Sequence, residues 1–297
     1  MKKKIIAAAG ISTLLMAGGV LSASASSSGY DLFKTAVKKT QNVKSFTAHV
    51  QASLEDNGKV VYKVDSVNAE NLKAESGHSA VQITKGGKTT NVDFYSSQNG
   101  TILKSSKDNK YYVRQEKDHK HEHKKEKDEK FSPQMQKDIE NIFDALTKNY
   151  QDKITTSDLG NGKTELQFDL SKEQVPAVAQ AIVSFYLKNM DHQENHKEKQ
   201  EFTSLKFGDL TPQLPKLKNN ISVTRVVLKG KVNNDQYLTG QEATIYVSGN
   251  DVNGTHHDLV LTVTSQLDQL NQAKVPTINL KGKKVVQIKE HHDGHED

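Results

Sequence analysis

The sequence predicts an α+β fold in which an antiparallel sheet is accompanied by a short N-terminal helix and two central helices. Apolar and polar residues alternate with a period of two over many short segments, and turn residues separate these segments. Two segments, 132–150 and 176–188, instead repeat their apolar residues every three or four positions, as a helix with one apolar face does. The second is so apolar, in so polar a chain, that we expect it to lie on a sheet or to cover a cavity.

The first 25 residues have the three parts of a secretory signal peptide. Three lysines at positions 2–4 precede an apolar run, and the small residues Ala23, Ser24 and Ala25 end it. We therefore expect export from the cytoplasm, with cleavage near Ala25, although an uncleaved membrane anchor is an alternative. No later stretch approaches the roughly 20 apolar residues of a spanning helix, so we expect no stable membrane span once the signal is removed.

Charge and cysteine usage exclude several classes of function. The chain has 41 Lys and Arg against 36 Asp and Glu, and loss of the three leader lysines lowers the net charge from +5 to about +2. Lysines alternate with acids and form no basic face with stacking aromatics, so we expect no nucleic-acid partner. The chain has no cysteine, which excludes disulfides, thiolate metal sites and a lipidated cysteine anchor.

The segment from Ser28 to Gln115 reads as one helix followed by an antiparallel meander. Ser28 can cap a helix that ends near Thr40. Residues 46–54 then alternate strictly between apolar and polar, and Asn57-Gly58 is a two-residue hairpin signal. Further turns at 86–87, 99–100 and 108–109 separate strand-like segments.

Residues 116–130 contain no apolar side chain and are predicted to form a solvated loop. A helix then begins with Ser132 as cap and Pro133 as its first residue. Residues 154–168 are predicted to form a hairpin around Gly160-Asn161-Gly162. The second central helix begins at Pro176, after a lead-in turn at 171–174, and a second polar loop at 191–201 follows it.

The last third is predicted to be strand again, at 221–232, 243–247 and 259–267. We expect a final extended segment at 276–280 on a sheet edge. The tail 289–297 is His-rich and predicted to be disordered. We thus expect a single domain over 26–288.

This order of elements resembles the LolA-like superfamily of bacterial lipoprotein and lipid carriers, from about Tyr30 to Leu280. No short motif carries the likeness. It implies a strongly curved half-barrel sheet with the central helices on its concave face and acyl chains bound between them. The chain departs from lipid-anchored members because it has no lipobox cysteine.

The carrier hypothesis requires an apolar cavity between the helices and the sheet. The helical stripes supply its candidate ligand-binding residues, although the same side chains could simply fill a closed core. These candidates are Ile139, Phe143, Leu146, Val178, Ile182, Phe185 and Tyr186.

Histidines in the two polar loops suggest a rival function. His119, His121 and His123 alternate in the first loop, and His192 and His196 are four residues apart in the second. Imidazole is a usual ligand of zinc, nickel or copper, so these five residues are candidate ligands of a divalent transition metal. No cofactor is certain, and the histidines could equally be ordinary solvated residues.

The sequence contains no complete catalytic motif among those considered. In His192-Gln193-Glu194-Asn195-His196 the glutamate is displaced from the general-base position of a zinc protease. The two Gly-Lys-Thr runs at 87–89 and 162–164 lack the earlier glycine of a phosphate loop and precede strands. The sequence therefore favours an exported, non-catalytic envelope protein that binds a lipid, lipoprotein or other hydrophobic ligand, or an envelope protein partner. The alternative is an extracytoplasmic metal-binding protein.

Overall fold

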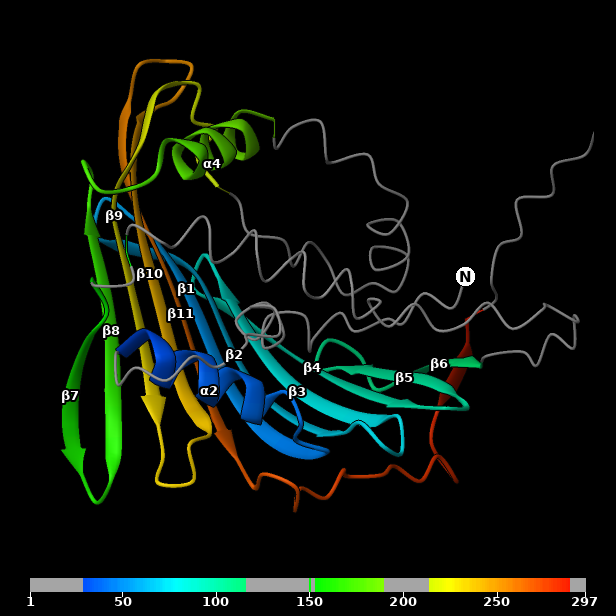
Figure 1. Ribbon diagram of the computed structural model, residues 1–297. Helices are drawn as coiled ribbons and strands as arrows, with labels where there is room; N and C mark the ends of the chain where they lie inside the picture. Colours follow the sequence, from blue (N-terminus) through cyan, green and yellow to red (C-terminus); the bar gives the residue numbers. More distant parts are fainter. Residues whose placement is uncertain (1–28, 116–149, 151–152, 190–213, 289–297) are drawn as a thin grey trace, which may run out of the picture.

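The described part of the chain is mostly β. The computed structural model describes residues 29–115, 150, 153–189 and 214–288, which form one curved, unclosed sheet of twelve strands with two helices on it (Figure 1). The predicted antiparallel sheet is therefore confirmed, with fewer helices than the α+β prediction implied. The leader, both His-rich loops and the tail lie outside the described residues, as does the first predicted central helix up to residue 149. The expectation of two central helices on the sheet is thus not supported.

The first half of the sheet is a meander of six strands. Its predicted turns are confirmed: Asn57 and Gly58, between the first two strands, have φ values of 50° and 77°, and a type I′ hairpin turn requires positive φ at both positions. The strands are β1 (Ser45–Asp56), β2 (Lys59–Asn71), β3 (Ser76–Lys85), β4 (Lys88–Ser97), β5 (Gly100–Ser105) and β6 (Tyr111–Gln115).

The second half contains the predicted hairpin and three long strands. The strands are β7 (Thr155–Gly160), β8 (Lys163–Ser171), β9 (Asn219–Val232), β10 (Leu238–Asn250) and β11 (His256–Asp268). β11 pairs antiparallel with β1, from Thr47 opposite Asp268 to Asp56 opposite Leu259. This pairing joins the two halves, and the strand order is β12-β6-β5-β4-β3-β2-β1-β11-β10-β9-β8-β7.

The edge strand β12 differs from the prediction. It consists of Val285–Gln287 and pairs in parallel with β6, whereas the segment 276–280 expected at an edge forms no strand. Pro276 has no N–H to donate to a ladder, whereas Val285 and Val286 have β-branched side chains that suit a strand.

Both described helices begin and end near the expected residues. Helix α2 (Gly29–Thr40) has Asp31 in its first turn and two lysines in its last, which complements the helix dipole. At its end the Thr40 hydroxyl donates to the Ala36 carbonyl at 2.7 Å and accepts from the Leu238 N–H at 2.8 Å. Helix α4 (Ala177–Asn189) follows Pro176 and the predicted lead-in turn. Among the described residues, no helix has the length and apolar character needed to span a bilayer.

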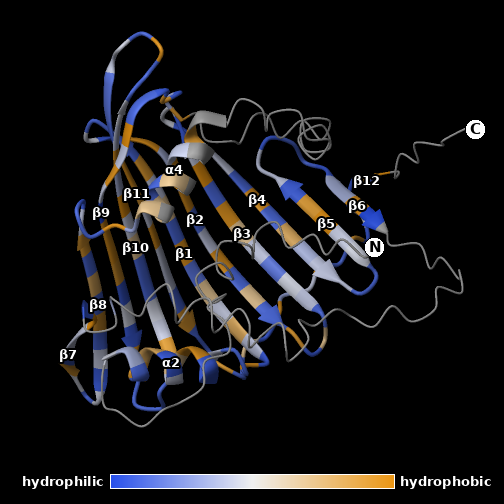
Figure 2. Ribbon diagram, turned by 45° about the horizontal axis from the view of Figure 1, so that its top comes forward, coloured by the Kyte–Doolittle hydropathy of each residue, from blue (hydrophilic) through white to orange (hydrophobic). Residues whose placement is uncertain are grey.

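The sheet has two unlike faces, because successive side chains of a strand point to opposite sides. Both helices contact the same side, which we call the helix face; the other side we call the polar face. Figure 2 shows apolar and polar residues alternating along the strands beneath α2 and α4. The cross-strand register assigns each residue to its face.

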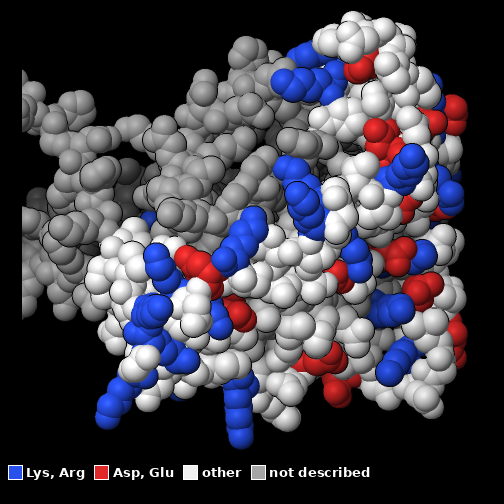
Figure 3. Space-filling model, turned by 180° about the vertical axis from the view of Figure 1, so that it is seen from behind, with Lys and Arg blue, Asp and Glu red and all other residues white. Residues whose placement is uncertain are grey.

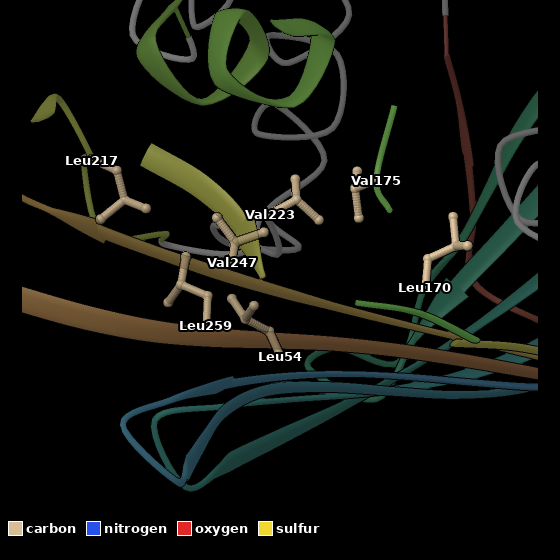
Figure 4. Close-up of a cluster of buried hydrophobic side chains, with 7 residues drawn as sticks. All are labelled: Leu54, Leu170, Val175, Leu217, Val223, Val247 and Leu259. Carbon is tan, nitrogen blue, oxygen red and sulfur yellow. The ribbon is translucent and has the colours of Figure 1, made fainter. Parts of the chain in front are cut away.

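The largest core cluster lies on the helix face beneath α4 (Figure 4). Its buried members come from strands β1, β8, β9, β10 and β11 and from two residues outside the strands, Val175 and Leu217, and Ala179, Val183 and Leu187 of α4 pack against them. Each fully buried aliphatic side chain contributes about 1.5–3 kcal/mol. The members are Leu54, Leu170, Val175, Leu217, Val223, Val247 and Leu259.

A second cluster forms under α2, where Ala36 and Val37 contact Leu166, Val232 and Leu238. The two helices therefore cover different ends of the same strands, and the sheet between them carries no described helix (Figure 2).

Candidate functional site

An apolar band crosses the strands on the helix face and extends from beneath α4 toward α2. It is made of two adjacent rows in direct cross-strand register, with one residue from each strand in a row. The first row is Phe168, Leu228, Ala243, Val263, Ala52, Val64 and Ile83, and the second is Leu170, Val226, Ile245, Leu261, Leu54 and Tyr62. On each of these strands every second residue points to the helix face, and most of these residues are apolar. Because the register aligns them across the strands, they form a continuous band.

Part of the apolar band is open to solvent. Leu228 is 40% exposed and Leu261 is 41% exposed, although their neighbours Leu54 and Leu170 are buried in the cluster beneath α4. The band therefore continues from a closed core into an uncovered apolar surface. Exposed leucines in adjacent rows on the helix-bearing side of a sheet are suited to hold an apolar ligand.

Buried polar groups lie next to the apolar band. Ser66 and Ser265 are the next residues on the same face, and Asn68 follows Ser66. Asn68 is 0% exposed and Ser265 is 4% exposed. The Asn68 amide donates to the Ser66 hydroxyl at 3.0 Å, but the Asn68 Oδ1 and the Ser265 Oγ find no hydrogen-bond partner in the described residues. Such orphaned atoms each cost about 1–3 kcal/mol.

Glu70 adds a carboxyl to the same face. It lies between Phe46 and Gly77 in the cross-strand register, and a Cβ on Gly77 would come within 2.6 Å of the Glu70 carboxyl oxygen. Burial against these neighbours raises the pKa of Glu70 to about 7. The helix face thus contains one group that titrates near neutral pH.

The described side chains that hold α4 on the sheet, Ala179, Gln180, Val183 and Leu187, are not members of the predicted ligand set. Val178, Ile182, Phe185 and Tyr186 lie in α4, but their side chains fall outside the described structure. Ile139, Phe143 and Leu146 fall outside it entirely. All seven stay predictions.

The residue that sequence reasoning missed is Gln180. Its side chain makes two hydrogen bonds of 2.7 Å with the backbone of Val223, one to the N–H and one to the carbonyl. β8 ends at Ser171, opposite Arg225, so Val223 lies beyond the paired part of β9 on that side. A polar glutamine in an otherwise apolar helix is the sequence signal that could have identified Gln180.

The five predicted metal ligands, His119, His121, His123, His192 and His196, lie outside the described residues. Within the described ranges no group of three or more His, Cys, Asp or Glu side chains could hold a metal ion. His257, in β11, instead has its Nδ1 at 2.9 Å from the Asp56 carboxylate and its Nε2 at 4.0 Å from Asp251. It joins the β1–β2 turn to the β10–β11 turn.

A cavity lies elsewhere, mainly over the polar face. It has a volume of about 1120 Å³ and a mixed lining, in which half of the residues are charged or carry an amide and the others, Ser66 and Ser265 among them, are mostly apolar or hydroxyl residues. Charged groups in a lining suit an apolar ligand less well than the apolar band does, so for the predicted ligand class we favour the apolar band.

Comparisons with known proteins leave the family open. No protein-family model and no curated protein matches the chain. The ywiB protein of Bacillus subtilis has 7% sequence identity over 75% of this chain and 91% of its own, with a TM-score of 0.15. A beta-barrel-like protein with a domain of unknown function from Brucella abortus has 8% identity over 76% of this chain and 96% of its own, with a TM-score of 0.17. TM-scores this low support no inference on fold or function, so the LolA-like likeness rests on element order alone.

Proposed function

We propose that this protein is an exported, non-catalytic binding protein that holds a hydrophobic or lipid-like ligand on the helix face of its sheet. The observation that carries the proposal is the apolar band, whose Leu228 and Leu261 are about 40% exposed beside a closed core. Export rests on the signal-peptide pattern of residues 1–25. A bacterial envelope is the setting that this pattern and the LolA-like resemblance suggest.

The ligand that fits this face is amphiphilic. Its apolar part would cover the open end of the apolar band and remove the exposed leucine surface from water. Its polar group would lie at the side of the band where Ser66, Ser265 and Asn68 follow the apolar rows. A fatty acid derivative or lipid with a hydroxyl or amide near its head has both parts.

The alternative occupant of the face is an envelope protein partner with an apolar helix or strand. The metal-binding alternative also stays a prediction, because its five histidines lie outside the described residues.

Binding of a dansylated fatty acid tests the proposal. Leu228→Gln and Leu261→Gln each remove apolar surface worth about 1 kcal/mol, so each should weaken binding about fivefold. The matched control is Val67→Gln, since Val67 is 43% exposed but lies on the polar face, and it should leave the affinity unchanged.

Two results would contradict the proposal. One is an equal loss of affinity in the Val67→Gln control, which would indicate non-specific adsorption to the surface. The other is unchanged affinity in the Leu228→Gln, Leu261→Gln double variant with native folding retained.

A further inference from the structure

The polar face carries a trough that crosses eight strands, from β4 through β3, β2, β1, β11, β10 and β9 to β8. Two adjacent rows in direct register line it. The first row is Asn91, Gln82, Asp65, Gln51, Thr264, Glu242 and Lys229, and the second is Asp93, Ala80, Val67, His49, Gln266, Gly240, Lys231 and Glu165. The trough therefore runs across the strands instead of along them.

Side-chain size explains the hollow. Gly240 and Ala80 lie in the second row, where other strands carry long side chains. A Cβ on Gly240 would come within 3.1 Å of the Lys231 side chain, so a larger residue there would press against Lys231. Figure 3 shows this side of the molecule, with basic and acidic residues interspersed over it.

Some lining side chains already pair with one another. Gln51 donates to Asp65 at 2.8 Å, Gln82 donates to Asn91 at 3.2 Å, and Lys229 contacts Glu242 at 3.1 Å. These cross-strand pairs hold neighbouring side chains of the lining in place along the trough.

Other lining groups are left free. Within the described residues, the side chains of Gln266, Lys231 and Glu165 make no hydrogen bond or ion pair with another residue. They offer a ligand an amide, an ammonium and a carboxylate, which together supply both donors and acceptors.

The charge of the lining excludes polyanions. The described lining residues include three lysines, Lys163, Lys229 and Lys231, against five carboxylates, Asp65, Asp93, Glu165, Glu242 and Asp268. A nucleic acid or another polyanion would need a basic groove, and for nucleic acid also stacking aromatics. The lining has neither.

A peptide also fits poorly. A strand added across the direction of the sheet strands cannot extend their hydrogen-bond ladder.

We propose that this trough binds an extended, neutral, polyhydroxylated chain, that is, an oligosaccharide. Hydroxyl groups both donate and accept, so they match a lining of amides, carboxylates and ammonium groups. Neighbouring strands lie about 4.8 Å apart, which is close to the length of one sugar unit in an extended β-linked chain. Eight strands therefore suit a glycan on the order of six sugar units.

Isothermal titration of the mature protein with cellohexaose and chitohexaose tests the proposal, with dextran sulfate as the polyanion. One of the neutral hexasaccharides should bind saturably, and dextran sulfate should not. Gln266→Ala and Lys231→Ala should each weaken the neutral ligand about fivefold, which corresponds to one lost hydrogen bond. Both side chains are exposed and make no hydrogen bond or ion pair with the part of the chain that the structure describes, so neither change should alter folding.

Two controls separate this trough from the rest of the molecule. Gln287→Ala removes an exposed glutamine on edge strand β12 and should leave oligosaccharide affinity unchanged. Leu228→Gln, on the opposite face, should also leave it unchanged, so that this test and the fatty acid test fail independently. Absence of saturable binding at millimolar hexasaccharide, tighter binding of dextran sulfate, or full affinity in the Gln266→Ala, Lys231→Ala double variant would each overturn the proposal.

Discussion

Gln180 in α4 replaces a missing strand neighbour of Val223 in β9. Its Oε1 accepts the Val223 N–H and its Nε2 donates to the Val223 carbonyl, both at 2.7 Å. Both Val223 groups belong to a residue that is almost fully buried. The amide therefore fixes the position of α4 on the helix face, beside the open end of the apolar band.

The variant Gln180→Ala should lower the free energy of unfolding by about 2–3 kcal/mol, because it leaves a buried donor and a buried acceptor unpaired. Gln180→Glu should also destabilise, since a carboxylate accepts the N–H but repels the carbonyl oxygen. Urea denaturation measures both effects, with Gln287→Ala as an exposed glutamine control. A loss below about 0.5 kcal/mol for Gln180→Ala would show that water satisfies Val223 equally well.

The two leucines Leu217 and Leu228 should respond differently to truncation. Leu217 is 0% exposed in the cluster beneath α4, so Leu217→Ala should cost about 3–4 kcal/mol. Leu228 is 40% exposed, so Leu228→Ala should cost less than about 1.5 kcal/mol. Thermal or urea unfolding measures both, and equal losses would mean that the apolar band is closed in solution.

Glu70 should make stability depend on pH. Burial raises its pKa from 4.5 to about 7 in the folded protein, so the folded state binds the proton more tightly than the unfolded state. Its stabilising effect is fully present below pH 4.5 and is lost as the pH rises through 7. Because Glu70 is partly exposed, we discount the loss to about 1–2 kcal/mol.

The variant Glu70→Gln should remove this pH dependence and be more stable than the natural protein at pH 8. Urea unfolding at pH 5 and pH 8 measures it. An unchanged pH profile in Glu70→Gln would assign the dependence to other groups.

His257 should act as a clamp between two turns. It lies between the carboxylates of Asp56 and Asp251, both mostly buried, and Asn57 adds backbone contacts to Asp258 in the same place. His257→Ala leaves the mostly buried Asp56 carboxylate without its imidazole partner, which should cost about 1–3 kcal/mol, whereas Asp251 keeps the N–H donors of Asn253 and Thr255. Faster amide exchange in the β1–β2 and β10–β11 turns measures the loosening; His256→Ala, an exposed neighbour, is the control. Equal exchange in both variants would rule out the clamp.

Local signals in the sequence predicted most strands and turns. The alternation over 46–54 and the dipeptide Asn57-Gly58 specify β1, its turn and its pairing with β2, because these contacts are close in sequence. The helix boundaries near Thr40 and Pro176 followed from caps and proline, which also act locally.

Contacts between distant segments could not be predicted in the same way. The pairing of β1 with β11 depends on residues more than 200 positions apart, and the parallel pairing of β12 with β6 depends on where the chain returns after β11. Alternation indicates that a strand has two faces but not which strands are neighbours. For the same reason the polar trough was not foreseen, since its rows exist only once eight strands are in register.

The candidate site was only partly foreseen. The apolar character of 176–188 correctly predicted a helix on the sheet, but the sequence analysis assigned no role to Gln180. The exposed part of the apolar band depends on what α2 and α4 leave uncovered, which is a property of packing and not of periodicity.

The most direct test of the central claim is native mass spectrometry of the mature protein, expressed with its own signal sequence and purified without a tag or added metal. We predict a bound mass of several hundred daltons, on the order of a lipid, that is released on denaturation and is depleted in the Leu228→Gln, Leu261→Gln double variant but retained in Val67→Gln. A bare polypeptide mass for the natural protein, or equal retention of the adduct in all variants, would contradict ligand binding on the helix face.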